Sequence, residues 1–580
     1  MPQNPSRWFD TVRQLTKALV AIPSVSPDVE AENRCAEKIA ELLAGERDSL
    51  QPMYWETGDG RKNVACLLKS HHPQNTGKTI VLMSHFDTVG VEDFARLGNS
   101  DLAFQPDELA SAMKNMLEQK RQSGELDHSE ESAFQALESG EWMFGRGSVD
   151  MKTGVAVNIA VMREFARTRE NGQRLIDELA GNLLFLSCPD EETESAGILS
   201  AVPELLKFRK QENLTYLGVI NTDYTAPRDL NRDARFVYSG TIGKLLPSFY
   251  FLGVRTHVGE VFRGVDASHI AAELVRRINL DPEWIDTWNG SLGGEKVAEV
   301  APPPVALQMR DLKPSYNVET AGEAFVYVNW LTLTKTPEEA MQKMKDVASA
   351  ALDAVFERID SSFTQFSSKG GQAQPPPDWT SFILTYEMVY QEARGRWDAA
   401  NKDKDFSDWL GATTASSAAS AKDGRELSRM IVAELVKAAQ ISGPAIVIFF
   451  LPPYYPSAQP QENELTLAVK SVVERSNAQV QFRGFYPYIS DLSYVRLDGG
   501  IEIDSLKNNM PLFGMRDEKG TLYYPLDSIK LEDIRALGCP VVNIGPFGSD
   551  AHGLYERVHM PYSFEVVPQI IFDTIYKTLG

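Results

Sequence analysis

Short apolar segments alternate with amphipathic helical patterns along the first 240 residues of the chain. Residues 79–84, 182–187 and 216–220 have strand length and are rich in Val, Ile and Leu. Residues 31–43 and 155–167 carry apolar positions at helical spacing. Buried strands separated by such helices are typical of an α/β fold built on a central sheet. We therefore expect this part of the chain to form the larger α/β domain.

A different order of elements begins near residue 239. The pattern predicts, in order, a strand, a helix, two strands, a long helix and a last strand: 246–253, 267–278, 305–312, 324–333, 337–359 and 381–390. The order βαββαβ predicts a ferredoxin-like α+β domain inserted in the larger one. We expect three parts: 1–238, the first part of the larger domain; 239–391, the insert; and 392–580, its second part, with a helical insertion near 392–443.

One segment of the first part departs from the α/β pattern. Residues 91–141 contain a helical pattern at 107–121 and an acidic tail that includes His128. The charges predict a solvated excursion, with His128 on its surface.

Composition limits the classes of partner. The 580 residues are 43% hydrophobic and 24% charged, as in globular proteins of several domains. The 80 acidic residues exceed the 58 basic ones, which gives a net charge of −22 and disfavours nucleic acid or an anionic membrane as the partner. No stretch approaches the about 18 apolar residues of a membrane span, and the first residues do not resemble a signal peptide. We expect a cytoplasmic protein.

The cysteines limit the chemistry further. They are far apart in the sequence and form no CxxC pair, which favours a reduced protein without structural disulfides. A metal in this protein would therefore be held by histidine and carboxylate side chains. The four are Cys35, Cys66, Cys188 and Cys539.

Histidine and acidic side chains follow three of the predicted strands. His85 and Asp87 end the first apolar segment, and alternation of an extended chain puts them on one side. Glu191 and Glu192 follow the second segment, and Asp223 follows the third. Because the carboxyl ends of parallel strands meet at one edge of a sheet, these side chains point to a common site. Adjacent buried acids repel each other unless cations compensate them.

Two more residues extend this group. Asp150 follows a glycine-bracketed turn and precedes a helix, where a plain N-cap is the alternative interpretation. His552 lies in a glycine-rich loop near the end of the chain. Nitrogen and oxygen ligands without thiolate suit zinc, with cobalt or manganese possible, and carboxylates can bridge two ions about 3.5–4 Å apart.

Five motifs in a fixed order resemble one family. HFDTV, GRGSVDMKTG, PDEE, NTD and DAHGLYE are similar to the dinuclear zinc family of glutamate carboxypeptidase, acetylornithine deacetylase and aminoacylase. The resemblance covers nearly the whole chain, and its length and the segment YPYISDLSYV are most similar to the arginine-utilization branch. It implies a zinc-exopeptidase-like catalytic domain, with a central mixed sheet flanked by helices, and an inserted ferredoxin-like lid through which a homodimer can form.

The resemblance also implies a ligand set for two zinc ions. Asp150 would bridge both ions. His85 and Asp223 would complete one site, and Glu192 and His552 would complete the other.

Three further roles follow from the resemblance. Asp87 would orient His85, and Glu191 would be the general base. His257, in the insert, would stabilise the oxyanion, although an imidazole at the edge of a strand is the alternative. The arginines that could bind a substrate carboxylate are Arg255, Arg263 and Arg310.

The expected function is that of a metal-dependent hydrolase. It would cleave an amide bond of a small peptide or N-acyl amino acid with water activated by two metal ions, in arginine or amino-acid catabolism. The alternative is a metal-binding scaffold or regulatory protein that keeps the fold without the chemistry. Intact motifs favour the enzyme.

Overall fold

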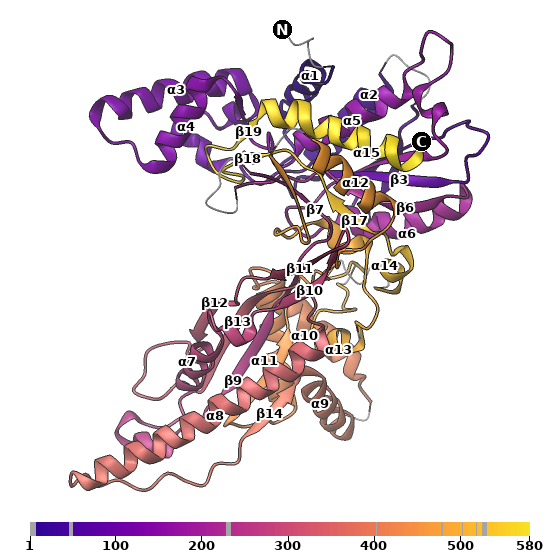
Figure 1. The fold of residues 1–580 in the computed structure, drawn as a ribbon. Coiled ribbons are helices and arrows are strands. Elements are labelled where there is room, and N and C mark those ends of the chain that lie inside the picture. The colour runs from indigo at the N-terminus through magenta and orange to yellow at the C-terminus, as the bar shows by residue number, and fades with distance from the viewer. Residues whose placement is uncertain are drawn as a thin grey trace.

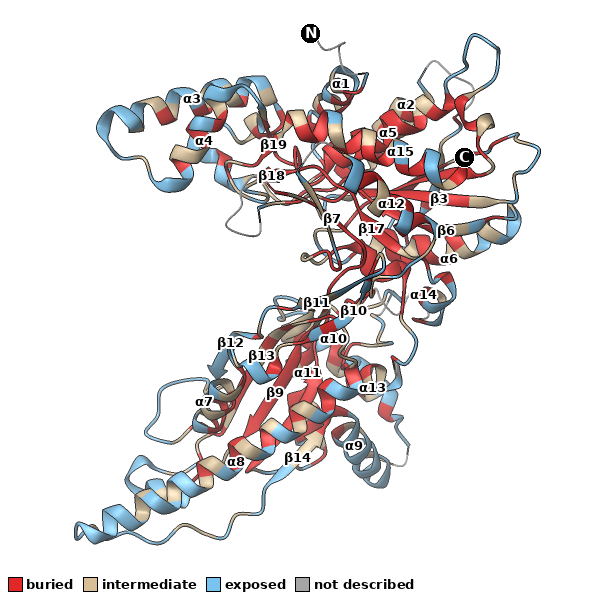
Figure 2. Ribbon diagram, viewed as in Figure 1, coloured by how far each residue is buried: buried red, intermediate tan, exposed pale blue. Residues whose placement is uncertain are grey.

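Two units, each built on its own sheet, make up the molecule (Figure 1). The computed structural model describes residues 7–580 except 46–49, 228–233, 402, 477–478, 502, 518 and 525–530. Buried residues concentrate in the two sheets and the helices against them, whereas α3 (Pro106–Ser123), α4 (His128–Ser139) and the far end of α8 (Pro337–Ser368) are largely exposed (Figure 2). None of the helices in the described ranges is long and apolar enough to cross a membrane.

The first unit contains an eight-stranded mixed sheet. Strand β3 (Lys78–His85) lies between β5 (Asn182–Cys188) and β6 (Thr215–Asn221) and is parallel to both, whereas β2 (Lys62–Leu68) is antiparallel to β5. This confirms the predicted α/β class with a central mixed sheet. In spatial order the strands are β1 (Met53–Glu56), β2 (Lys62–Leu68), β5 (Asn182–Cys188), β3 (Lys78–His85), β6 (Thr215–Asn221), β17 (Val541–Asn543), β7 (Arg235–Tyr238) and β16 (Val480–Arg483).

Helices cover both faces of this sheet. Because successive strand residues point to opposite faces, Ile80 and Leu82 belong to one hydrophobic core and Val81 and Met83 to the other. The helices of the first face are α1 (Phe9–Val20), α2 (Val29–Ala44), α5 (Lys152–Ala166), α12 (Glu464–Arg475) and α15 (Val567–Leu579). Those of the second face are α6 (Ala196–Gln211) and α14 (Leu531–Leu537).

The second unit has the predicted βαββαβ order. Its elements are β9 (Pro247–Leu252), α7 (Ala267–Ile278), β12 (Val305–Asp311), β13 (Glu323–Thr332), α8 (Pro337–Ser368) and β14 (Phe382–Thr385). An additional short strand, β8 (Gly243–Leu245), precedes β9 and pairs with β13. The last strand is shorter than predicted. The Thr385 hydroxyl accepts the backbone N–H of Met388, so the chain turns into α9 (Tyr386–Ala400) where a strand was expected to continue.

A further strand joins this second sheet. Strand β15 (Ala445–Phe450) lies between β9 and β14, antiparallel to the first and parallel to the second. Parallel neighbours need a long crossover, which α9, α10 (Phe406–Ala418) and α11 (Gly424–Ala438) provide. The insert was expected to end at residue 391, but β15 belongs to the second sheet, so the second unit continues beyond that residue. The helical region near 392–443, expected as an insertion in the larger domain, is the crossover between β14 and β15 of the second unit.

Residues 503–516 also pack against the second unit. Helix α13 (Ile503–Asn508) contacts α8, and the backbone N–H of Phe450 donates to the Asn509 carbonyl over 2.8 Å. The Asn509 side-chain oxygen accepts the backbone N–H of Glu387 over 3.2 Å.

The excursion at 91–141 is more ordered than its charges suggest. It forms α3 (Pro106–Ser123) and α4 (His128–Ser139), whose facing sides bury a core of their own that includes Leu109 and Phe134. His128 is exposed, as expected. The remaining strands are a hairpin of β10 (Thr287–Leu292) and β11 (Glu295–Val300), and a small sheet of β4 (Trp142–Phe144), β18 (Gly548–Ser549) and β19 (Arg557–His559).

We predict that Asp286→Ala destabilises the second unit. The buried Asp286 carboxylate accepts the backbone N–H groups of Leu333, Thr334 and Lys335 at 2.7, 2.7 and 2.9 Å. Removing it leaves these three N–H groups and the Thr334 hydroxyl, which donates to Asp286 Oδ1 over 2.8 Å, without their acceptor, at a cost of about 3 kcal/mol in the free energy of unfolding. Urea unfolding followed by tryptophan fluorescence measures this. Asp281→Ala, which removes an acceptor of one N–H, should cost only about 1 kcal/mol; equal losses would contradict the prediction.

Candidate metal centre

Three neighbouring strands bring the predicted acids and imidazole together. His85 is the last residue of β3 and pairs in register with Cys188, the last residue of β5. The PDEE turn therefore begins directly beside His85. On the other side of β3, strand β6 ends at Asn221, two residues before Asp223.

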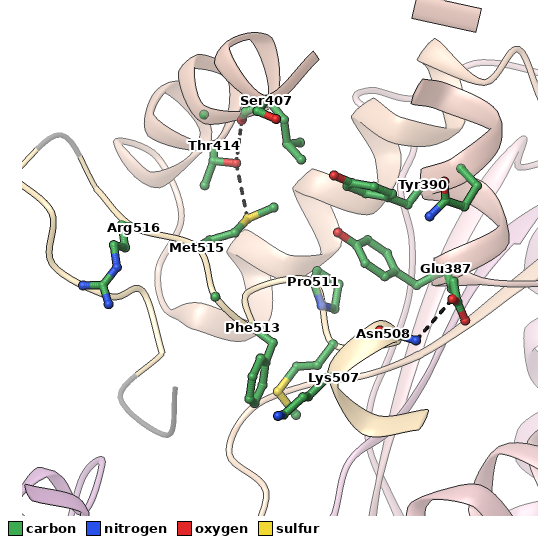
Figure 3. Close-up of a pocket in the computed structure, with 16 residues that line it drawn as sticks. Glu387, Tyr390, Ser407, Thr414, Lys507, Asn508, Pro511, Phe513, Met515 and Arg516 are labelled. Carbon is green, nitrogen blue, oxygen red and sulfur yellow. Dashed lines mark hydrogen bonds between the residues drawn. The ribbon is translucent and has the colours of Figure 1, made fainter. Parts of the chain in front are cut away.

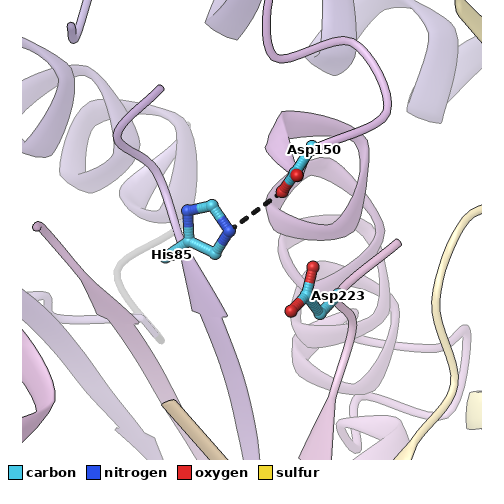
Figure 4. A group of neighbouring side chains, drawn as sticks. All are labelled: His85, Asp150 and Asp223. Atoms are coloured by element: carbon cyan, nitrogen blue, oxygen red, sulfur yellow. Dashed lines mark hydrogen bonds and ion pairs between the residues drawn. The ribbon is translucent and has the colours of Figure 1, made fainter. Parts of the chain in front are cut away.

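Asp150 faces two histidines with its two carboxylate oxygens. Its Oδ1 lies 3.1 Å from His85 Nε2, and its Oδ2 lies 3.1 Å from His552 Nε2. Helix α5 has Met151 in the N-cap position and no side-chain cap, so the alternative interpretation of Asp150 as a plain N-cap is wrong. Figure 4 shows His85 and Asp223 turned toward the same carboxylate.

The side chains fall into two groups that share Asp150. His85, Asp150 and Asp223 form one, and Asp150, Glu192 and His552 form the other. Within each group the ligand atoms lie within 4.8 Å of one another. In the second group, His552 Nε2 lies 3.1 Å from a Glu192 carboxylate oxygen and equally close to Asp150 Oδ2.

Asp87 and Glu191 lie beside these groups. Asp87 Oδ1 is 3.5 Å from His85 Nδ1, and the Asp87 carboxylate accepts the backbone N–H groups of Glu191 and Glu192 at 3.0 Å each. Glu191 Oε2 lies 3.9 Å from His85 Nε2. Asp87 is fully buried, holds the turn that carries the two glutamates through these two hydrogen bonds, and faces the His85 ring.

Negative charge dominates the site. Burial, reinforced by the charge of Asp150, raises the pKa of Glu192 and that of Asp223 to about 7 each. Burial also raises the pKa of Glu191 well above its ordinary value. Hydrogen bonds to Asp150 and Glu192 raise the pKa of His552 to about 10.

The donor set fits divalent cations. Among the residues that the structure describes, no lysine or arginine lies within 4.0 Å of the carboxylates of Glu191, Glu192 or Asp223. Clustered buried carboxylates need positive charge, and two cations on two sets of nitrogen and oxygen ligands would supply it.

A buried ion pair behind the site was not predicted. Arg146 Nη1 lies 2.5 Å from Glu556 Oε2, and both side chains are almost fully buried. The guanidinium also donates to the His552 carbonyl over 3.0 Å, and Glu556 Oε1 accepts the backbone N–H of Asp150 over 3.4 Å. The pair thus connects two of the expected ligands. Arg146 and Glu556 lie inside two of the motifs quoted above, GRGSVD and DAHGLYE. Their place in these motifs was the feature of the sequence by which they could have been found.

We predict that Glu556→Gln weakens metal binding. The change leaves the buried Arg146 charge uncompensated and loosens the backbone of Asp150, so metal affinity should fall about 10- to 100-fold. Competition with a fluorescent chelator measures it. Glu178→Gln, in the exposed pair with Arg169, should leave the affinity unchanged. An unaltered affinity in Glu556→Gln would contradict the role of the pair.

Asp491 is a second unpredicted neighbour. It lies in the segment YPYISDLSYV and is buried, and burial raises its pKa well above the ordinary value. Its charge acts on Glu191, whose pKa it raises further.

The structure does not bring His257 to these residues. It precedes the short helix η4 (Val258–Arg263) of the second unit, and its Nδ1 accepts the backbone N–H of Gly259 over 3.1 Å. Two of the candidate arginines are engaged elsewhere: Arg310 binds Glu426, and Arg263 binds Gln374.

Comparisons with known proteins agree with this picture. The model of Peptidase family M20/M25/M40 matches residues 124–537. This range contains the four acidic residues of the site, begins after His85 and ends before His552; the four are Asp150, Glu191, Glu192 and Asp223. Two Bacillus subtilis proteins align over more of the chain. Protein RocB is 31% identical over 593 residues, covering 98% of this chain and 95% of RocB. The uncharacterized protein YqjN is 31% identical over 542 residues, covering 92% and 88%.

A solved structure shares the fold. Aminopeptidase PepT from Bacillus cereus superposes with a TM-score of 0.50 and 12% identity, over 98% of both chains. The family match spans more than half of the chain, and the identity with RocB extends over nearly all of it. The chain therefore belongs to peptidase family M20/M25/M40 and is a metallopeptidase-like hydrolase.

Proposed function

We propose that the protein hydrolyses an amide bond of a small peptide or N-acyl amino acid with two bound divalent ions. Zinc is the first candidate, and cobalt and manganese also suit the ligands. The observation that carries the proposal is the placement of the two Asp150 oxygens, each 3.1 Å from a different imidazole. It divides the ligands into two sets with one shared carboxylate.

The chain's own residues would hold both ions. His85 and Asp223 with Asp150 would bind one ion, and Glu192 and His552 with Asp150 would bind the other. When bound, the cations would polarise the scissile carbonyl and lower the pKa of a water molecule.

Glu191 would carry the proton in this reaction. Its carboxylate would accept a proton from the attacking water and return it to the nitrogen of the departing amine. Asp87 would hold Glu191 in place through the backbone N–H that it accepts, and would orient His85 through Nδ1.

The second unit would act as a lid in this proposal. His257 would stabilise the oxyanion after movement of the lid, or from a neighbouring subunit of a homodimer. The proposal places this activity in arginine or amino-acid catabolism in the cytoplasm, as the resemblance in the sequence implies.

Elemental analysis and a hydrolysis panel test the proposal together. We expect about two ions per chain and cleavage of dipeptides or N-acyl amino acids that a chelator abolishes and zinc or cobalt restores. Bound metal without hydrolysis of any compound would instead favour the scaffold or regulatory protein of the same fold. The intact Glu191, which a scaffold does not need, supports the enzyme.

A further inference from the structure

A cavity of about 460 Å³ lies in the second unit, apart from the metal centre. Helices α9 and α10 form one side, and residues 507–516 form the other (Figure 3). None of the expected metal ligands lines it. Its volume is in the range of sites that hold small organic molecules.

The buried residues that form the floor of the cavity are mostly apolar. Tyr386, Leu410 and Met510 line it and are buried. The hydroxyl of Thr414, also buried, donates to the Leu410 carbonyl over 2.8 Å and is therefore already paired. Such a floor accepts an apolar side chain.

The walls add aromatic and sulfur surface. Tyr390, Phe513 and Met515 line the cavity and are half-buried. Figure 3 shows Phe513 and Met515 on one side of the space and Tyr390 on the other. Flat rings and a polarizable thioether favour contact with an aliphatic or aromatic group.

Opposite charges stand at the two ends of the rim. Figure 3 shows Glu387 and Arg516 on opposite sides of the cavity, with Pro511 and Phe513 between them. Both are exposed. Glu387 accepts a hydrogen bond from the Asn508 amide over 3.2 Å, and Arg516 donates to the Gly520 carbonyl over 2.7 Å.

Neither charge is paired with an opposite one among the residues that the structure describes. In the described part of the chain, no basic side chain lies within 4.0 Å of the Glu387 carboxylate, and no acidic one lies that close to the Arg516 guanidinium. Lys507, the other cation of the rim, is 3.6 Å from Glu532. The rim thus offers one anion and one cation on either side of an apolar floor.

We propose that this cavity binds a short zwitterionic peptide with an apolar side chain. The ammonium group would pair with Glu387, the carboxylate with Arg516, and the side chain would rest on the floor. A single amino acid carries its two charges on one carbon, whereas each added residue separates them by up to about 3.3–3.6 Å. Charges on opposite sides of the cavity therefore match a peptide better than a free amino acid. The site is distinct from the one proposed to cleave peptides.

Calorimetric titration with the dipeptide leucyl-phenylalanine tests the proposal. The full-length, metal-loaded protein carries Glu191→Gln in this experiment, so that the peptide is not consumed. We expect saturable binding, and at least about tenfold weaker binding of the N-acetylated, C-amidated dipeptide, which lacks both charges. The metal centre of Glu191→Gln would also bind the dipeptide if the proposed function holds, so only binding that the cavity variants described next weaken is assigned to this cavity.

Two glycines supply a matched pair of variants. Gly411, on α10, lines the cavity, and Gly395, on α9, does not; a Cβ at either position meets no atom within 4 Å. Gly411→Leu should fill the cavity and weaken binding at least about tenfold, whereas Gly395→Leu should not change it. Both changes favour helix, and thermal melts verify the folding of each variant.

Charge variants locate the two ends of the peptide. Glu387→Gln and Arg516→Gln should each weaken leucyl-phenylalanine binding about tenfold and leave binding of the blocked dipeptide unaltered. Absence of dipeptide binding would overturn the proposal. Binding that Gly411→Leu, Glu387→Gln and Arg516→Gln all leave unchanged would assign the peptide to another site and would overturn it as well.

Discussion

Glu191→Gln should lower kcat by about 10²- to 10⁴-fold while the protein keeps its two metal ions. The amide has the shape of the carboxylate but cannot accept the proton of the attacking water. Glu191 belongs to neither set of candidate ligands, although its Oε2 lies only 3.9 Å from His85 Nε2. Steady-state kinetics on the best substrate of the panel, together with elemental analysis, measures both effects.

A neighbouring glutamate provides the control for this variant. Glu194 lies three residues further along the chain, is exposed, and belongs to neither ligand group. Glu194→Gln should retain the activity of the wild-type protein. Full activity in Glu191→Gln would remove Glu191 from the reaction, and loss of metal in that variant would make it a ligand instead of a base.

Asp150→Asn should remove both metal ions and abolish hydrolysis. Asp150 is the one residue common to the two ligand groups, and its two carboxylate oxygens face His85 and His552. A neutral amide offers one oxygen and no charge to balance two cations. We expect less than about one ion per chain after dialysis and a melting temperature that added zinc no longer raises.

The matched substitution is Asp177→Asn. Asp177 is paired with Arg174 at 2.7 Å, away from the ligand groups, and its replacement should leave metal content and activity as they are. Retention of two ions in Asp150→Asn would show that the two sites do not share a bridging carboxylate.

The gathering of the candidate ligands could be predicted because it follows from strand ends. His85 ends one of three strands that lie side by side in the sheet, and Glu192 and Asp223 follow the other two. Apolar segments locate the strands, and the rule that their carboxyl ends share one edge brings the side chains together. The spatial order of the strands was not needed for that inference.

Other features needed the structure. An apolar strand buried on both faces, such as β15, fits either sheet, so the sequence does not say which one it joins. The pairing of Arg146 with Glu556 joins residues 410 positions apart, and no local pattern specifies such a partner. His257 illustrates the opposite case, because its expected role comes from resemblance and its position depends on how the two units are arranged.

The contact of residues 503–516 with the second unit bears on how the molecule can move. The chain enters that unit near β8 and leaves it after β15, and these two connections run alongside each other, with Lys244 and Tyr455 bridged. Two adjacent connections alone would form a simple hinge. Asn509, however, is bound to Phe450 and Glu387, so it ties a later part of the chain to the same body. A rotation of the second unit about the two connections would have to carry residues 503–516 with it. These residues act as a third connection between the units and limit the range of that rotation.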